Sequence, residues 1–315
     1  MITKARLAVR QALHGITPGD HVIVAVSGGA DSLLLAHCLA LEGKQHALRI
    51  TAVIVDHQLQ VNSSNIANAT KNKLLAMGIS NVDVVSVQVM KKDGLEADAR
   101  SARYAALNSC AQTLDARAIF LGHNQDDLAE SVLLGLTQGS GTKSLAGMAT
   151  HSGLYIRPFL AITREEVVNA CVEVGIEYWS DPHNEDERFT RVKIRTQILP
   201  LMESLIGPGI KEALARSARI FREDSDALDL LSEEIFTTIP DPTKIEVVLL
   251  EKLPVALRKR VIRRAISRLG ANRISAEQLD WVDALISDWH GQGAVALPAG
   301  VTARRESGRL ALSRE

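Results

Sequence analysis

The most constraining feature of the sequence is a run of five apolar residues, 22–26 (VIVAV), that leads directly into the segment SGGADS at residues 27–32. An unbroken apolar run rich in β-branched residues predicts a strand of a parallel sheet that is buried on both faces. Residues 31–41 then have the composition of a helix. A strand, a glycine-containing turn and a helix in this order predict an α/β fold with a parallel sheet.

The turn itself is suited to binding phosphate groups. Gly28 and Gly29 lack a Cβ atom and can adopt positive φ angles, so their N–H groups can approach an anion closely. The helix expected to begin at Asp31 presents free N–H donors and the positive end of its dipole to the same anion. Ser27 and Ser32 add hydroxyl donors. The segment 27–32 is therefore a candidate phosphate cradle.

This cradle differs from the usual nucleoside-triphosphate loop. That loop needs a lysine for the terminal phosphate, and no lysine lies between Gly19 and Gly43. A purely structural alternative is that Asp31 or Ser32 caps a buried helix and that the glycines only form a tight turn. The residues of the turn alone leave both interpretations open.

Strand and helix patterns alternate through the first half of the chain. We expect a first helix at 1–13, further strands at 50–55, 82–89 and 118–121, and further helices at 66–77, 95–114 and 126–136. Such alternation predicts a parallel sheet with flanking helices, and ligands bind at the carboxyl ends of its strands. Asp56-His57 and Gly122-His123 directly follow strands, so we expect them at the same edge as the SGGADS turn.

The second half of the chain has a different character. A possible strand at 154–160 and helices at 164–173 and 194–205 are followed by the breaker cluster Ile206-Gly-Pro-Gly209. We place a domain boundary there, which gives domains at 1–206 and 207–315. The second domain is expected to be smaller and mainly helical, with helices at 212–235, 254–269 and 275–289 and a terminal β-ribbon at 295–312.

Composition limits the environment of the protein. The chain has 315 residues, a formal net charge of −1, and three cysteines, Cys38, Cys110 and Cys171, that stand far apart without a C-x-x-C motif. Neither a disulfide framework nor a zinc or iron–sulfur site is indicated, and a reducing cytoplasm is expected. No stretch approaches the roughly 18 consecutive apolar residues of a membrane helix, so no membrane partner is expected.

A second candidate site lies in the segment GHNQDDLAESVLL at residues 122–134. Asp127 and Glu130 are three residues apart and would lie on one face of a helix, opposite an apolar stripe. Two carboxylates beside a nucleotide site can hold a cationic amine. The alternative is that the pair belongs to an ordinary solvated helix face.

Two basic clusters stand out against the near-neutral net charge. Either could contact nucleic acid or form a solvated helix face. Their members are Arg188, Arg191, Lys193 and Arg195 in the first cluster, and Arg258, Lys259, Arg260, Arg263 and Arg264 in the second.

The segment SGGADS resembles the SGGxDS signature of the PP-loop ATP pyrophosphatases, which split ATP between the α and β phosphates and transfer AMP to an oxygen of the substrate. Together with the segment 122–134, the resemblance narrows to the tRNA(Ile)-lysidine synthetases, the TilS family, over residues 22–205. The further segments that carry it are Gly139-Ser140-Gly141, Leu145-Ala-Gly-Met148, Arg157-Pro158, Asp181-Pro182, Asn184 and the stretch from Arg191 to Arg195.

The resemblance implies a reaction and its partners. Enzymes of that family use ATP to adenylate the carbonyl at carbon 2 of the wobble cytidine in an isoleucine tRNA with a CAU anticodon. The ε-amine of free L-lysine then displaces AMP to give lysidine, which changes codon reading from AUG to AUA. The resemblance also implies Mg²⁺ beside ATP, a possible homodimer and tRNA contacts in the second domain, where we expect the face of Arg258–Arg264 to contribute.

The resemblance also implies roles for individual residues. The segment from Ser27 to Ser32 would bind the ATP phosphates, with Asp31 placing Mg²⁺ and acting in catalysis. Arg103 matches an arginine that acts on ATP and on the transition-state phosphate; its structural alternative is an ion pair with Glu96 or Glu42. The lysine-binding carboxylates would be Asp127 and Glu130, with Arg195 near them.

The sequence departs from the family pattern at two positions, and two other functions remain open. Gln60 stands where the family tends to have arginine, and Val192 replaces an asparagine, which affects the expected tRNA or lysine contacts. A PP-loop tRNA thiolase would share the ATP site but needs paired cysteines or an iron–sulfur cluster. A non-catalytic nucleotide sensor would keep the glycine turn without a reason to keep Arg103, Asp127 and Glu130 together.

Overall fold

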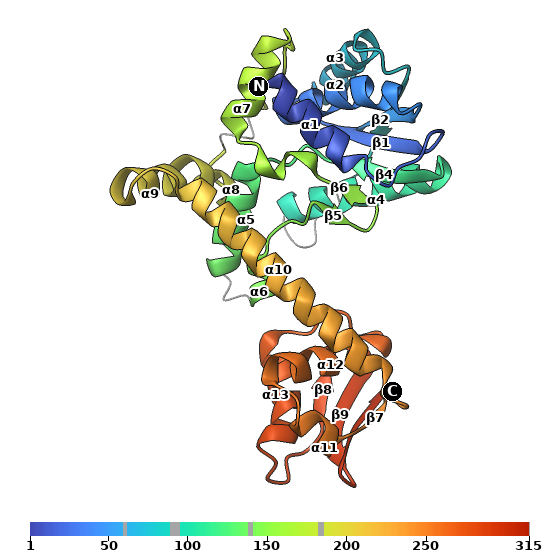
Figure 1. Ribbon diagram of the computed structural model, residues 1–315, viewed down its shortest axis with the longest axis vertical. Helices are drawn as coiled ribbons and strands as arrows, with labels where there is room; N and C mark the ends of the chain where they lie inside the picture. The colour runs from blue at the N-terminus through green and yellow to red at the C-terminus, as the bar shows by residue number, and fades with distance from the viewer. Residues whose placement is uncertain (59–61, 89–94, 138–140, 182–185, 315) are drawn as a thin grey trace. The chain divides into compact units, whose positions relative to one another are not determined.

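The computed structural model describes residues 1–58, 62–88, 95–137, 141–181 and 186–314, with only the backbone described at 95–96 (Figure 1). The chain forms two compact units. The first comprises Met1–Thr137 and Gly147–Ala218, and the second comprises Gln138–Ala146 and Arg219–Glu315. The predicted domain limits, 1–206 and 207–315, stay a prediction.

The first unit is built on a six-stranded sheet in the order β3-β2-β1-β4-β6-β5. The predicted central strand is β1 (His21–Val26), which pairs in parallel with both of its neighbours. Only the edge strand β5 is antiparallel, so the prediction of a parallel sheet is confirmed. The other strands are β2 (Arg49–Asp56), β3 (Asn81–Ser86), β4 (Ala116–Phe120), β5 (His151–Ser152) and β6 (Tyr155–Ile156).

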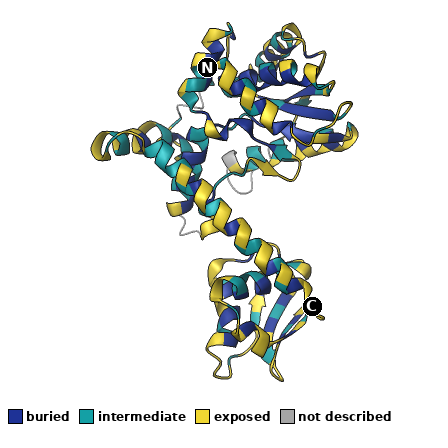
Figure 2. Cartoon of the chain, viewed as in Figure 1, coloured by how far each residue is buried: buried dark blue, intermediate teal, exposed yellow. Residues whose placement is uncertain are grey.

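Helices cover both faces of this sheet, and its central strands are buried on both sides (Figure 2). On one face, Val22, Val24 and Val26 of β1 join a core built with α1, α2, α3 and α7. On the other face, Ile23 joins a second core with α4. The helices are α1 (Ile2–Ala12), α2 (Ala30–Gln45), α3 (Ser63–Ala76), α4 (Leu95–Thr113), α5 (Gln125–Thr137) and α7 (Arg164–Glu173).

A buried carboxylate joins the first two helices of this unit. Glu42 of α2 has no exposed surface, and its two oxygens accept hydrogen bonds from Arg6 Nε at 2.7 Å and Arg10 Nε at 2.9 Å. Hydrogen bonding to Arg10 lowers the pKa of Glu42. The helix that follows the SGGADS turn is therefore fixed to α1 by ion pairs as well as by apolar packing.

The strand expected at 154–160 is shorter than predicted. Only Tyr155–Ile156 forms β6, and Pro158 begins a 3₁₀ helix, Pro158–Ala161. Proline has no N–H to donate to a strand ladder, which explains the early end. The helix expected at 194–205 is divided into a π-helical turn, Ile194–Ile198, and α9 (Leu199–Ile206), preceded by the short α8 (Thr190–Lys193).

The second unit combines helices with a four-stranded antiparallel sheet in the order β7-β10-β9-β8. The predicted helices are present, and the predicted ribbon is the pair β9 and β10, to which β7 and β8 add outer strands. The helix α10 (Ile210–Thr237) begins in the first unit and ends in the second. The remaining elements are α6 (Thr142–Leu145), β7 (Lys244–Glu246), α11 (Val247–Glu251), α12 (Val255–Arg268), α13 (Ala276–Ser287), β8 (Val295–Leu297), β9 (Val301–Glu306) and β10 (Arg309–Arg314).

The basic cluster of α12 makes contacts within its own unit. Arg258 is buried and pairs with Asp283 of α13 through two hydrogen bonds of 2.7 and 3.0 Å, so it forms neither a solvated face nor an open contact for RNA. The other cations of the cluster also bond within the unit, but Arg263 is exposed and Lys259, Arg260 and Arg264 are partly exposed, so the two interpretations of their surface stay open. Their partners are Asp280 for Lys259, Asp229 for Arg260, the Ile274 carbonyl for Arg263, and Ser232 for Arg264.

Replacement of Arg258 by alanine should destabilise the second unit by about 3–5 kcal/mol, because it leaves the buried Asp283 carboxylate without its partner. Denaturant unfolding measures this loss. Lys259→Ala serves as the control, since Lys259 pairs with Asp280 at the surface and such a pair contributes about 0–1 kcal/mol. Equal losses in the two variants would contradict a structural role for the buried pair.

Within the described residues, no helix is both long enough and apolar enough to cross a membrane.

Candidate active site

A cavity of about 420 Å³ opens at the carboxyl ends of β1, β2 and β4. Its walls include the SGGADS turn, Asp56-His57 and Gly122-His123, which the sequence predicted to lie at one edge. Arg103 of α4, together with Trp179 and Asp181, completes the lining. The parallel registers explain this arrangement, because Val26 of β1 aligns with Ile54 of β2, and Val24 aligns with Phe120 of β4.

The two glycines of the turn have different conformations. Gly28 has φ of +88°, and a Cβ atom there would lie 2.7 Å from Oγ1 of Thr70. Gly29 is the N-cap of α2 with φ of −78°, so the expectation of a positive φ holds only for Gly28. Ala30 is the first residue of α2, and its position places the free N–H groups of the helix beside the cavity.

Hydrogen bonds inside the turn fix its shape. The Ser27 N–H donates to Oγ of Ser32 at 3.1 Å, and the Ser32 hydroxyl donates to the Gly29 carbonyl at 3.1 Å. The Ser27 hydroxyl lies 3.2 Å from the Ser32 hydroxyl. The hydroxyl of Ser32 therefore holds the turn from inside, and Ser32 also lines the cavity, so its expected role as a ligand donor stays a prediction.

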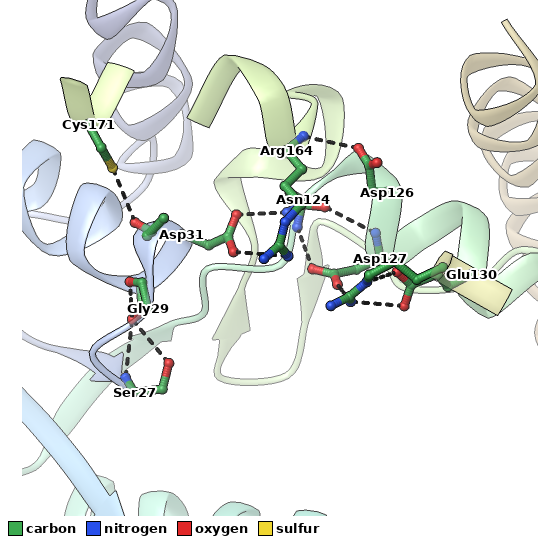
Figure 3. A network of polar contacts seen from close by, with 12 residues as sticks. Ser27, Gly29, Asp31, Asn124, Asp126, Asp127, Glu130, Arg164 and Cys171 are labelled. Atoms are coloured by element: carbon green, nitrogen blue, oxygen red, sulfur yellow. Dashed lines mark hydrogen bonds and ion pairs between the residues drawn. The ribbon is translucent and has the colours of Figure 1, made fainter. Parts of the chain in front are cut away.

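Asp31 lies in the first turn of α2 and points toward the start of α5 (Figure 3). Its Oδ1 accepts a hydrogen bond of 2.7 Å from Nδ2 of Asn124, and its Oδ2 lies 4.0 Å from Nη1 of Arg164. Burial, and next the Asp127 carboxylate, raise the pKa of Asp31. This carboxylate lines the cavity beside the SGGADS turn.

A close backbone contact brings the segment after β4 against the first turn of α2. A Cβ atom at Gly122 would lie 2.9–3.0 Å from the backbone of Asp31 and Ser32, so only glycine allows this approach. The adjacent His123 lines the cavity, and its Nδ1 has no hydrogen-bond partner among the described residues. Burial, and next Arg103, lower the pKa of His123 to about 3, so its imidazole is neutral.

Arg103 is a half-buried cation on the wall of the cavity. Its Nε is buried without a hydrogen-bond partner in the described part of the chain, and burial lowers the pKa of its guanidinium. The proposed ion pair with Glu42 is wrong, because Arg6 and Arg10 occupy that carboxylate. The side chain of Glu96 lies outside the described residues. A half-buried guanidinium with an unpartnered Nε at a cavity wall is suited to receive an anion.

Asp127 and Glu130, the predicted carboxylate pair, both contact the predicted arginine, Arg195. Arg195 Nε donates to Oε1 of Glu130 at 2.6 Å, and Arg195 Nη2 lies 3.1 Å from Oε2 of Glu130 and 3.3 Å from Oδ1 of Asp127 (Figure 3). Glu130 has no exposed surface, and burial raises its pKa while Arg195 opposes the shift. The two carboxylates therefore do hold a cation, the guanidinium of Arg195, and the solvated-face alternative is wrong.

Sequence reasoning missed Asn124, which is fully buried between the two groups of carboxylates. Its Oδ1 accepts from the Asp127 N–H at 3.0 Å, and its own N–H donates to Oδ2 of Asp127 at 2.9 Å. This reciprocal pair is a capping box at the start of α5. The spacing Asn-x-x-Asp before an apolar run was the available signal.

Parts of the family resemblance fall outside the described structure. These are the departure at Gln60 and the motif residues Gly139, Ser140, Pro182 and Asn184. The other departure, Val192, is buried in α8.

Two family models match most of the chain. The PP-loop domain matches residues 3–202, and the TilS substrate binding domain matches residues 246–311. A tRNA(Ile)-lysidine synthase of Thermobifida fusca is 44% identical over 315 residues, covering 99% of this chain and 97% of the relative. The chain belongs to the tRNA(Ile)-lysidine synthase family. A synthase of the same name from Streptomyces coelicolor is 43% identical, covering 95% of this chain and 86% of the relative.

A solved structure supports the fold of this family member. The U34-tRNA thiolase NcsA from Methanococcus maripaludis, described with its [4Fe-4S] cluster, aligns with a TM-score of 0.59 and 20% sequence identity. The alignment covers 70% of this chain and 78% of the thiolase chain. At this identity the likeness shows the fold alone. Among the described residues, no group of three or more His, Cys, Asp or Glu side chains could hold a metal ion.

Proposed function

We propose that this chain attaches lysine to carbon 2 of the wobble cytidine of tRNA(Ile) with a CAU anticodon, through an adenylated tRNA intermediate that uses ATP. The observation that carries the proposal is the position of the pair Asp127 and Glu130, which binds a guanidinium. A single side chain, Asn124, separates this pair from Asp31 of the phosphate-binding turn. A cation site therefore adjoins a nucleotide site, as ligation of an amine to an activated base requires.

In the first step, the carbonyl oxygen of the cytosine attacks the α-phosphorus of ATP, and pyrophosphate leaves. The segment Ser27–Ser32 supplies N–H donors for the phosphates, and Arg103 supplies a guanidinium for the charge that develops during transfer. The chemistry of Asp31 fits Mg²⁺, which binds proteins through one or two carboxylates together with substrate phosphates and water. Bound there, Mg²⁺ would neutralise phosphate charge.

In the second step, the ε-amine of lysine attacks carbon 2, and AMP leaves with the oxygen. Free lysine carries an ε-ammonium with a pKa of roughly 10.4, so it must lose a proton before it attacks. Burial raises the pKa of Glu130, which makes this carboxylate a stronger base than an exposed glutamate. Asp127 and Glu130 bind the ammonium in this proposal, and Arg195 lies beside it.

The partners beyond ATP follow from the family. The segment 207–315 is proposed to bind tRNA, and the match of residues 246–311 to a substrate binding domain supports this. We also propose L-lysine as the amine, a cytoplasmic location and a homodimer as the assembly. The contribution expected from the Arg258–Arg264 face is proposed for Lys259, Arg260, Arg263 and Arg264, which keep exposed surface, and not for Arg258, which is buried in its pair with Asp283.

The test is incorporation of radiolabelled lysine into an unmodified tRNA(Ile) transcript with the CAU anticodon, in the presence of ATP and Mg²⁺. A tRNA(Met) transcript with the same anticodon is the control. Label in the isoleucine tRNA alone, lost in Asp127→Ala, supports the proposal. Pyrophosphate release that depends on tRNA without incorporation of label would exclude lysine as the nucleophile.

A further inference from the structure

Asn124 connects two carboxylates that the proposed function assigns to different steps. Its Nδ2 donates to Oδ1 of Asp31 at 2.7 Å, while its Oδ1 accepts from the N–H of Asp127 at 3.0 Å (Figure 3). The Asn124 side chain has no exposed surface, so water does not replace either bond. No other residue bonds through its side chain to both Asp31 and Asp127 among those described.

The orientation of the amide is fixed by chemistry. The N–H of Asp127 can only donate, so the amide oxygen of Asn124 must face it, and the NH₂ group must face Asp31. A histidine or glutamine would be too long for this cap, whereas aspartate and serine are equally good N-caps but lack the NH₂ donor. Substitution of Asn124 by serine or aspartate would therefore keep the helix cap and remove the hydrogen bond to Asp31.

We propose that Asn124 is a positioning residue for the adenylation step. Its amide holds the Asp31 carboxylate toward the phosphates of ATP and ties it to the first turn of α5, where Asp127 and Glu130 bind lysine. This inference rests on the proposed function, and it adds a residue that links the two half-reactions. Asn124 acts through Asp31 and does not itself touch the reacting atoms.

The experiment compares Asn124→Ser, Asn124→Asp and Asn124→Ala with the unchanged protein. Adenylation is measured as tRNA-dependent pyrophosphate release without lysine, at varied ATP and Mg²⁺ concentrations. Lysine binding is measured as KM in the ligation assay, and folding as Tm. Thr163→Ala is the matched control, because Thr163 forms the same kind of capping box with Glu166 at the start of α7.

The three variants should separate the cap from the bond to Asp31. Asn124→Ser keeps the cap, so Tm and KM for lysine stay near the original values, while kcat for pyrophosphate release falls by about 10–100-fold. Asn124→Asp also keeps the cap but places a carboxylate against Asp31, so the loss should be larger and the Mg²⁺ requirement should change. Asn124→Ala loses both contacts and should lower Tm as well. Thr163→Ala should lower Tm alone.

Two outcomes would overturn the inference. One is an unchanged rate of pyrophosphate release in Asn124→Ser, and the other is a loss of rate that follows Tm across all four variants, as a merely structural role would give. Failure of the proposed function is distinguishable, because it would appear in the unchanged protein as absent lysine incorporation. The pyrophosphate assay reports on Asn124 without any contribution from lysine.

Discussion

Replacement of Arg103 by methionine should lower kcat for tRNA-dependent pyrophosphate release by about 100–1000-fold, the usual cost of losing one donor to a developing anion. The same change should leave Tm unchanged or raise it. The guanidinium is half-buried and its Nε has no partner within the described residues, so the folded protein carries a desolvation cost that methionine removes. In Arg103→Met, kcat should therefore fall without a fall in Tm.

The control for Arg103→Met is Arg103→Lys, which keeps the positive charge and loses the planar donor set. We expect Arg103→Lys to recover only part of the lost rate, because an ammonium cannot reproduce the geometry of the Nε donor. Thermal unfolding without ATP and pyrophosphate release with saturating ATP provide the two measurements. A fall of several degrees in Tm for Arg103→Met would assign Arg103 to the fold instead of to the phosphates.

Replacement of Glu130 by glutamine should strongly slow the ligation step and spare adenylation. The carboxylate is fully buried and lies beside Arg195, and in the proposed function it binds the ε-ammonium and accepts its proton, which glutamine cannot do. We therefore expect kcat/KM for lysine to fall by about 100-fold or more. The rate of pyrophosphate release without lysine should remain within about threefold, since Glu130 lies beyond Asn124 from the cavity.

The control for Glu130→Gln is the same substitution at Glu173, an exposed glutamate that pairs with the N-terminal ammonium. Glu173→Gln should change neither step, because exposed pairs contribute about 0–1 kcal/mol. If Glu130→Gln reduced pyrophosphate release and lysine incorporation equally, the carboxylate would serve the structure of α5 instead of lysine binding.

Local patterns predicted most of the first unit. The apolar run of β1 and the glycine turn placed the sheet and its functional edge, because buried parallel strands and strand-to-helix turns leave strong signals in short segments. The spacing of Asp127 and Glu130 correctly placed both carboxylates on α5 and beside a cation. The strand predicted at 154–160 is shorter because Pro158 cannot continue a strand ladder.

Pairings between distant segments could not be predicted in the same way. In the sequence, Arg258 belongs to a basic cluster. Nothing near it in the sequence indicates that it is buried and paired with Asp283. The bond from Asn124 to Asp31 likewise joins residues 93 positions apart. The sequence shows which charged residues are present. Which of them are buried and paired depends on how the sheet and helices bring distant segments together.

The buried Glu42 has a consequence for how the protein can be shortened or expressed. A chain from which the first ten residues were deleted would lack both Arg6 and Arg10 and would enclose an unpaired carboxylate, at a cost of about 3–5 kcal/mol. The destabilised element would be α2, whose first turn includes Asp31. Loss of α1 is therefore expected to weaken the packing of α2, whose N-terminal residues line the cavity, and an affinity tag is better added before residue 1 than exchanged for α1.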